Sequence, residues 1–200
     1  MPIYGLVLTL YVQSIPESFY ARDSLFYLHD QHKQSFLVLF FIFTVAAPGL
    51  SLVMLRLNKT ISSLELDNPK ERSLPIGITA LYFFLMFGFL VYQQEGFIPD
   101  ILVSTSLGGF LSAILCLFIT RKMKISLHAM GVGSLLGFLI GYFQTQAQFG
   151  MWIIYFVIAM GVITTTSRLI LDKHTLKQTA WGYGLGFFVQ LITIFIYSQL

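Results

Sequence analysis

Residues 74–92 read LPIGITALYFFLMFGFLVY and contain no charged side chain. As a helix rising 1.5 Å per residue, this stretch is about 28 Å long, close to the hydrocarbon thickness of a bilayer, roughly 30 Å. In lipid, only helices and closed barrels satisfy all of their backbone hydrogen-bonding groups. The stretch lacks the alternation of polar and apolar residues that marks a barrel strand, so it predicts a transmembrane helix.

The rest of the chain repeats this pattern. Further apolar stretches run over 3–12, 35–56, 98–119, 127–143, 150–166 and 180–199. A full span needs roughly 17–25 apolar residues, so we expect the stretch at 3–12 to be a half-span, an interfacial helix or the end of a span that begins before residue 1. The sequence predicts an all-α integral membrane protein with residues 1–200 in one domain. Its expected architecture is a bundle of six transmembrane helices plus a short or truncated N-terminal apolar segment.

Composition agrees with a membrane protein. The chain is 56% hydrophobic and 10% charged, with a mean hydropathy of +0.77, whereas soluble domains carry roughly 25% charged residues. This excludes a soluble globular enzyme and a disordered protein. The 12 Lys and Arg residues form no dense basic run, so nucleic acid is not an expected partner. The single cysteine, Cys116, excludes an internal disulfide.

The polar breaks between the stretches differ in charge. If the last six stretches all cross, the breaks at 13–34, 93–96 and 144–148 share one membrane face, and those at 56–73, 121–126 and 167–179 share the other. Two Lys and Arg residues lie in the first set, Arg22 and Lys33. Ten lie in the second set: Arg56, Lys59, Lys70, Arg72, Arg121, Lys122, Lys124, Arg168, Lys173 and Lys177. The positive-inside rule would make the second face cytoplasmic, but cations of an anion site would bias that count, so both assignments stay open.

Two segments of the basic face combine histidine with cations. One runs from Lys124 through Ser126 to His128, and the other contains Arg168, His174 and Gln178. Arginine and lysine bind phosphate oxygens, and a helix N-terminus at Ser126 would add free N–H donors. One imidazole can attack phosphorus while the other protonates the leaving oxygen. These residue types therefore favour phosphoryl transfer, with Gln178 accepting the ring N–H of His174 if the segment is helical.

Arg72 offers a third cation at the same depth, three residues before Pro75, which suits the first turn of a helix. Simpler interpretations stay open beside the functional one. The histidines suit solvated interfacial positions, the lysines suit snorkelling anchors, Ser126 suits a helix cap, and Arg72 suits a charged loop that ends in a helix start.

The two segments resemble the type 2 phosphatidic acid phosphatase superfamily. Its second motif reads Pro-Ser-Gly-His, matched here by Ser126 and His128, and its third reads Ser-Arg, five residues, His, three residues, Asp, matched by Ser167, Arg168 and His174. The forms Lys-x-Ser-x-His-Ala and His-Thr-x-x-Gln resemble a small, divergent bacterial branch. The opening residues MPIYG are similar to an internal stretch of that branch.

The resemblance implies a role for each matched position. His174 would be the nucleophile that forms a phosphohistidine, and His128 the general acid for the leaving alcohol. Arg168 and Ser126 would hold the phosphate, with Lys124 assisting. No metal or other cofactor is required. The implied substrates are lipid phosphates and pyrophosphates, such as phosphatidic acid, phosphatidylglycerophosphate and polyprenyl pyrophosphate, and the implied location is a bacterial cytoplasmic membrane.

The chain also departs from the family pattern. The terminal Asp of the third motif is Gln178 here, and a neutral amide orients the imidazole without stabilising its charged form. The first motif should read Lys, six residues, Arg-Pro, but Leu74 precedes Pro75 and Asp67 holds the lysine position, which leaves Arg72 as a shifted substitute. A catalytically inactive relative that binds anionic lipid head groups is therefore the main alternative. A haem protein with His128 and His174 as axial ligands and a small transporter are further alternatives.

Small residues recur along the stretch at 127–143. Ala129, Gly133, Gly137 and Gly141 follow one another at four-residue spacing, which lets two helices approach closely. We expect this stripe to pack inside the bundle rather than to form a homodimer face.

Overall fold

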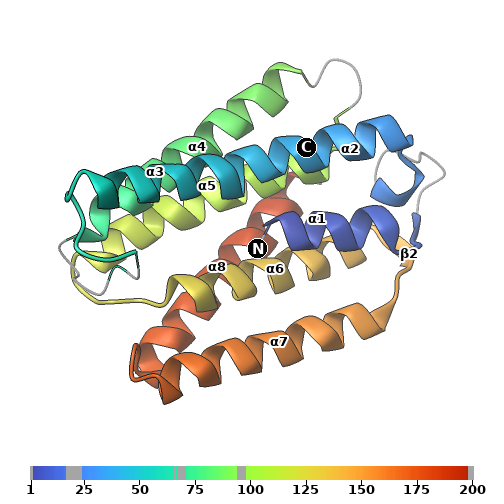
Figure 1. Ribbon diagram of the computed structural model, residues 1–200. Helices are drawn as coiled ribbons and strands as arrows, with labels where there is room; N and C mark the ends of the chain where they lie inside the picture. Colours follow the sequence, from blue (N-terminus) through green and yellow to red (C-terminus); the bar gives the residue numbers. More distant parts are fainter. Residues whose placement is uncertain (1, 17–23, 65, 67–70, 94–97, 198–200) are drawn as a thin grey trace.

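The computed structural model describes residues 2–16, 24–64, 66, 71–93 and 98–197; Arg22, Asp67 and Lys70 lie outside this part of the chain. Its α-helices are α1 (Pro2–Tyr11), α2 (Asp30–Phe41), α3 (Ala47–Leu57), α4 (Ser73–Tyr92), α5 (Asp100–Thr120), α6 (Leu127–Phe143), α7 (Met151–Ile170) and α8 (Leu176–Tyr197). Most of them run roughly side by side, and α8 crosses behind α6 at an angle (Figure 1). Shorter elements are the 3-10 turn η2 (Leu25–Tyr27), the π-helical turn η3 (Ile42–Ala46) and the strands β1 (Ile15–Pro16) and β2 (Gln146–Gln148).

The prediction of a helical fold with membrane-spanning segments is confirmed, but the described residues contain five such segments rather than the expected six. Five helical segments among the described residues are long and apolar enough to cross a membrane: Asp30–Leu57, Ser73–Tyr92, Asp100–Thr120, Met151–Ile170 and Leu176–Tyr197. The expected sixth span, α6, has 17 residues and is about 26 Å long. The N-terminal helix α1 has 10 residues, as expected for a segment too short to cross.

Two helices begin earlier than their apolar stretches. The segment expected from residue 35 starts at Asp30, because the ring of His29 accepts the backbone N–H of Gln31 and Asp30 places an acidic group in the first turn. The last helix, expected from residue 180, starts at Leu176. Hydrophobicity marks the part of a helix that lies in lipid, whereas capping groups decide where the helix itself begins.

The longest segment, Asp30–Leu57, is not uniformly α-helical. Its middle turn, η3, is a π-helix, and Pro48 is the second residue of α3, which begins directly after this turn. Proline lacks the N–H that would continue the α-helical ladder, and its ring crowds the carbonyl one turn back. The wider π turn accommodates this interruption without ending the helix.

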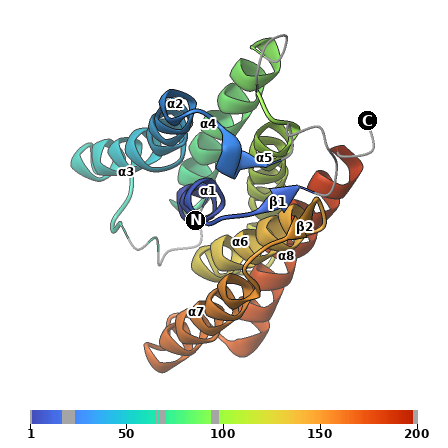
Figure 2. The same cartoon turned by 90° about the vertical axis from the view of Figure 1, so that its right-hand side faces the viewer.

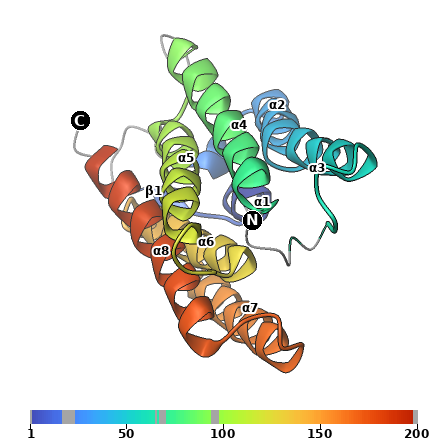
Figure 3. The same ribbon diagram turned by 90° about the vertical axis from the view of Figure 1, so that its left-hand side faces the viewer.

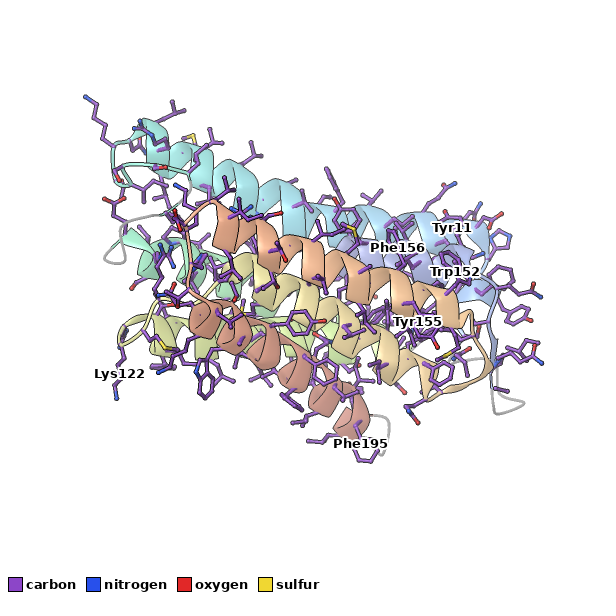
Figure 4. The ribbon with its side chains drawn as sticks, turned by 90° about the horizontal axis from the view of Figure 1, so that it is seen from below. Tyr11, Lys122, Trp152, Tyr155, Phe156 and Phe195 are labelled. Atoms are coloured by element: carbon purple, nitrogen blue, oxygen red, sulfur yellow. The ribbon has the colours of Figure 1, made fainter. Side chains whose placement is uncertain are left out.

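Loops predicted to share a membrane face meet at each end of the described structure, while residues 94–96 of the break at 93–96 lie outside the described residues. At one end, β1 pairs antiparallel with β2 (Figure 2), and the buried hydroxyl of Tyr142 lies 2.9 Å from the Ser14 hydroxyl and accepts the Leu25 N–H at 3.1 Å. At the other end, the Ser126 N–H donates to the Gln178 carbonyl at 3.2 Å. Figure 4 places Lys122 at this basic end, and Tyr11 and Trp152 toward the opposite one.

Helices α6 and α8 pack most closely (Figure 3). Gly133 and Gly137 of α6 lie against the carbonyl groups of Tyr183 and Phe187 in α8, where a Cβ atom would collide with backbone. In return, Gly186 of α8 lies against the Met130 carbonyl of α6. The small-residue stripe therefore packs inside the molecule, as predicted, and this contact brings the two histidine-bearing segments to the same place.

Candidate active site

Three chain segments supply the predicted site residues at the basic end. Arg72 precedes the first residue of α4. Lys124, Ser126 and His128 lie in the α5–α6 connection and the first turn of α6. Arg168 is in the last turn of α7, His174 is in the α7–α8 loop, and Gln178 is in the first turn of α8. Each segment therefore joins a loop to a membrane helix.

Hydrogen bonds join the three segments. Arg72 Nη1 donates to the Ile125 carbonyl at 3.4 Å, and the N–H groups of Ser126 and His174 donate to the carbonyls of Gln178 and Arg168 at 3.2 and 3.3 Å. The charges of Lys124 and Arg72 and the ring of His128 act on His174. Arg168 acts in the same way on His128, whose side chain is exposed at the start of α6. The structure thus brings together both histidines and three of the cations that the sequence singled out.

The ring of His174 is oriented by Gln178. The side-chain oxygen Oε1 of Gln178 lies 3.1 Å from His174 Nδ1, and it also accepts the backbone N–H of Thr175 at 3.3 Å. A backbone N–H is only a donor, so the amide atom facing it must be the oxygen. An oxygen acceptor requires Nδ1 of His174 to carry the proton. The lone pair of the neutral ring is then on Nε2, the atom available for attack or for accepting a proton.

The sequence identified Gln178 as the partner but for a different reason. A shared helix face was expected, whereas α8 begins at Leu176 and His174 precedes it. The contact instead comes from a capping box. The Thr175 hydroxyl accepts the Gln178 N–H at 3.4 Å while the Gln178 side chain returns to the Thr175 N–H. From the sequence, Thr175 was noted only within the form His-Thr-x-x-Gln and was given no role, although its three-residue spacing to Gln178 is the recognisable signal of this motif.

The environment of His174 disfavours its charged form. Partial burial lowers the pKa of the ring below its ordinary value of 6.5, and the cations Lys124 and Arg72 lower it further. The hydrogen bond to Gln178 acts in the opposite direction and raises the pKa. The net result is an imidazole that is neutral near pH 7, as a nucleophile or base must be.

Ser126 is the helix cap that the simpler interpretation predicted. Its hydroxyl oxygen accepts the Ala129 N–H at 3.3 Å, and its side chain is fully buried, with 0% exposure. The backbone N–H of Ser126 is engaged by Gln178. Its role in holding phosphate therefore stays a prediction, while its role in the structure is to start α6 and join it to α8.

Arg72 is buried rather than exposed on a loop, with 4% of its surface accessible. Its Nε donates to the Leu66 carbonyl at 2.6 Å, and its Nη1 donates to the Ile125 carbonyl at 3.4 Å. Arg72 thus braces the connection that carries Lys124 and Ser126, and its positive charge acts on His174.

Arg168 differs from Arg72 in its bonding. Its Nε is buried, yet among the described residues it has no hydrogen-bond partner. Buried polar groups are nearly always paired, and a guanidinium pairs strongly with phosphate or carboxylate oxygens. Arg168 is therefore the cation best prepared to take an anionic ligand.

No group of three or more His, Cys, Asp or Glu side chains arranged to hold a metal ion is present within the described ranges. Comparisons of the whole chain with protein-family models, with curated proteins and with solved structures give no match. The assignment of a function to this site therefore depends on its own residues and on the two motifs quoted above.

Proposed function

We propose that this protein is a membrane-embedded, metal-independent phosphatase that hydrolyses a lipid phosphate or pyrophosphate through a phosphohistidine. The observation that carries the proposal is the contact between Gln178 Oε1 and His174 Nδ1. It leaves the lone pair of His174 on Nε2. The backbone N–H of His174 donates to the carbonyl of Arg168, the arginine whose buried Nε has no hydrogen-bond partner within the described ranges. The likeness of the two histidine segments to the phosphatidic acid phosphatase superfamily supports the same chemistry.

The reaction needs two transfers at phosphorus. In the first, Nε2 of His174 attacks phosphorus, the bond to the lipid oxygen breaks, and a protonated His128 gives its proton to that leaving oxygen. In the second, neutral His128 takes a proton from water, whose oxygen attacks phosphorus and breaks the bond to His174. The group that leaves in the first transfer is the lipid alcohol of a phosphate ester or the lipid monophosphate of a pyrophosphate. The second transfer releases orthophosphate in both cases, and both histidines return to their starting protonation states.

The cations stabilise the charge that the phosphoryl group carries. Arg168 and Lys124 would bind its oxygens, with Ser126 and the more deeply placed Arg72 contributing at the edge of the site. Gln178 supplies no negative charge, so it orients the ring without favouring the imidazolium. The proposed site therefore uses a neutral orienting group and a cationic surrounding, both of which keep His174 unprotonated before attack.

The surroundings of His174 favour a lipid rather than a soluble phosphate ester. Ile170, Leu171 and Leu176 flank the loop and are 76%, 59% and 67% exposed, which is the arrangement expected of residues that face acyl chains. Our proposal includes α6 as a sixth span and places the site at the depth of the lipid head groups. It also places the protein in a bacterial cytoplasmic membrane.

The test is phosphate release by purified protein in detergent with EDTA. Phosphatidic acid, phosphatidylglycerophosphate and undecaprenyl pyrophosphate are offered to the wild type, to His174→Ala and to His32→Ala, which changes an exposed histidine in α2. We expect release that His174→Ala abolishes and His32→Ala preserves. Release that survives His174→Ala contradicts the mechanism. Folded protein that binds vesicles of anionic lipid but releases no phosphate would support the non-catalytic alternative instead.

A further inference from the structure

The first turn of α8 touches the backbone that precedes α6. The Ser126 N–H donates to the Gln178 carbonyl at 3.2 Å. Gly182 is one turn further along α8, on the same face as Gln178. A Cβ atom on Gly182 would lie 2.5 Å from the Ser126 carbonyl oxygen and 3.3 Å from both its carbonyl carbon and its nitrogen. Only a residue without a side chain permits this approach.

The α6 side of the contact is held firmly. The Ser126 carbonyl accepts the Met130 N–H at 2.9 Å, and the Ser126 hydroxyl caps the Ala129 N–H. Arg72 holds the neighbouring carbonyl of Ile125, and Ser126 itself is fully buried. Because this side is so constrained, a side chain at position 182 would move α8 instead.

We propose that Gly182 is a positioning residue for the active site, an inference that rests on the proposed phosphatase function. A displacement of α8 at Gly182 carries Gln178 with it and breaks the backbone bond to Ser126. Because Gln178 Oε1 holds the ring of His174, the displacement also shifts His174 relative to His128. The absence of a side chain at one position thus sets the spacing of the nucleophile and the general acid.

Two other glycines provide matched controls for Gly182→Ala. A Cβ on Gly184, two residues further along α8, would meet nothing within 4 Å, so Gly184→Ala makes the same chemical change without a collision. A Cβ on Gly141 would meet the Ile194 side chain, with its nearest atom at 2.9 Å. Gly141→Ala therefore disturbs the same helix pair at the end away from the histidines.

The experiment has two readouts. Hydrogen exchange of the Ser126 amide, followed by NMR in micelles, reports the bond to Gln178 whether or not the protein is an enzyme. Phosphate release measures kcat and therefore reports whether the active site keeps its geometry. In Gly182→Ala we expect the Ser126 amide to exchange at least about tenfold faster and kcat to fall roughly 10- to 100-fold, while both controls keep wild-type values. Slow exchange in Gly182→Ala, or fast exchange with wild-type kcat, overturns the inference.

A second variant keeps the inference testable if Gly182→Ala does not fold. Replacing Ser126 by its α-hydroxy acid analogue converts the preceding amide to an ester and removes the N–H without adding atoms at Gly182. We expect kcat to fall in this variant, as it does in Gly182→Ala. A kcat equal to that of the wild type would also overturn the inference. If the wild type releases phosphate from no substrate, the proposed function fails, and amide exchange alone then decides whether Gly182 joins the two segments.

Discussion

Gln178 Oε1 lies 3.1 Å from Nδ1 of His174, and the same oxygen accepts the Thr175 N–H at 3.3 Å. One amide oxygen therefore caps a membrane helix and determines the tautomer of an imidazole. The two tasks are coupled, because the ring is held correctly only when the first turn of α8 is formed. This relationship leads to the first prediction.

Replacing Gln178 by glutamate or by leucine should separate orientation from charge. Gln178→Glu keeps an oxygen for both donors and adds a negative charge, so we expect the pKa of His174 to rise and activity to persist. Gln178→Leu keeps the bulk but removes the acceptor, so both tautomers become accessible and kcat should fall on the order of 10²-fold. Phosphate release and ¹⁵N-histidine NMR measure the two effects. Equal kcat in the leucine variant and the wild type would contradict the orienting role.

The pH dependence should reflect the lowered pKa of His174. In the unfolded chain the ring titrates near 6.5, so the folded state binds fewer protons just below that pH. Stability is therefore highest above about pH 6.5 and decreases as the pH falls toward the folded pKa. The acid limb of kcat/KM should likewise lie below pH 6.5.

Variants of Lys124 test how much its charge contributes to the lowered pKa of His174. Lys124→Gln removes a positive charge that lowers the pKa of His174, so the NMR titration midpoint of the ring should move upward. Lys124→Arg retains the charge and should leave the midpoint close to that of the wild type. The same titration midpoint in Lys124→Gln and in the wild type would show that the lysine is not close to the ring.

Arg72 should matter for stability as well as activity. Arg72→Met leaves the Leu66 and Ile125 carbonyls without their charged donor, and each bond to a charged group contributes about 1.5–3 kcal/mol. We expect the free energy of unfolding to fall by about 3 kcal/mol. Denaturant unfolding in mixed micelles measures the change. Arg72→Lys keeps the charge with a single ammonium group, so its free energy of unfolding should lie between that of the wild type and that of Arg72→Met. Wild-type stability in Arg72→Met would contradict the bracing role.

The α6–α8 contact allows a comparison between two glycines. Gly133→Ala places a Cβ against the Tyr183 carbonyl, whereas Gly88→Ala in α4 meets nothing within 4 Å. Helix propensity alone favours alanine over glycine by about 1 kcal/mol. We therefore expect Gly88→Ala to be neutral or stabilising and Gly133→Ala to lower the thermal unfolding midpoint. Similar midpoints for the two variants would show that the helices can separate at little cost.

The membrane class and the helices could be predicted from the chain alone. A run such as residues 74–92 has one way to pair its backbone in lipid, so its conformation follows from its composition. Each helix that crosses the membrane carries the chain to the opposite face, so the sequence also predicts which loops lie at the same end. Local sequence also contains the Thr175–Gln178 capping box, since both partners lie within one turn.

Other features depend on tertiary structure, because they join residues that are distant in the chain. The burial of Arg72 depends on the Ile125 carbonyl, and the bond between Ser126 and Gln178 depends on α8 lying against α6. A stripe of glycines predicts that another helix packs closely against it, but it does not identify that helix or the register in which the two helices align. The sequence by itself determined that His128, His174 and ten of the twelve Lys and Arg residues fall at one end of a helical membrane protein. Only the packing of α8 on α6 decided that the loop of His174 meets the segment of His128, because the absence of side chains at Gly182 and Gly186 lets these helices approach so closely.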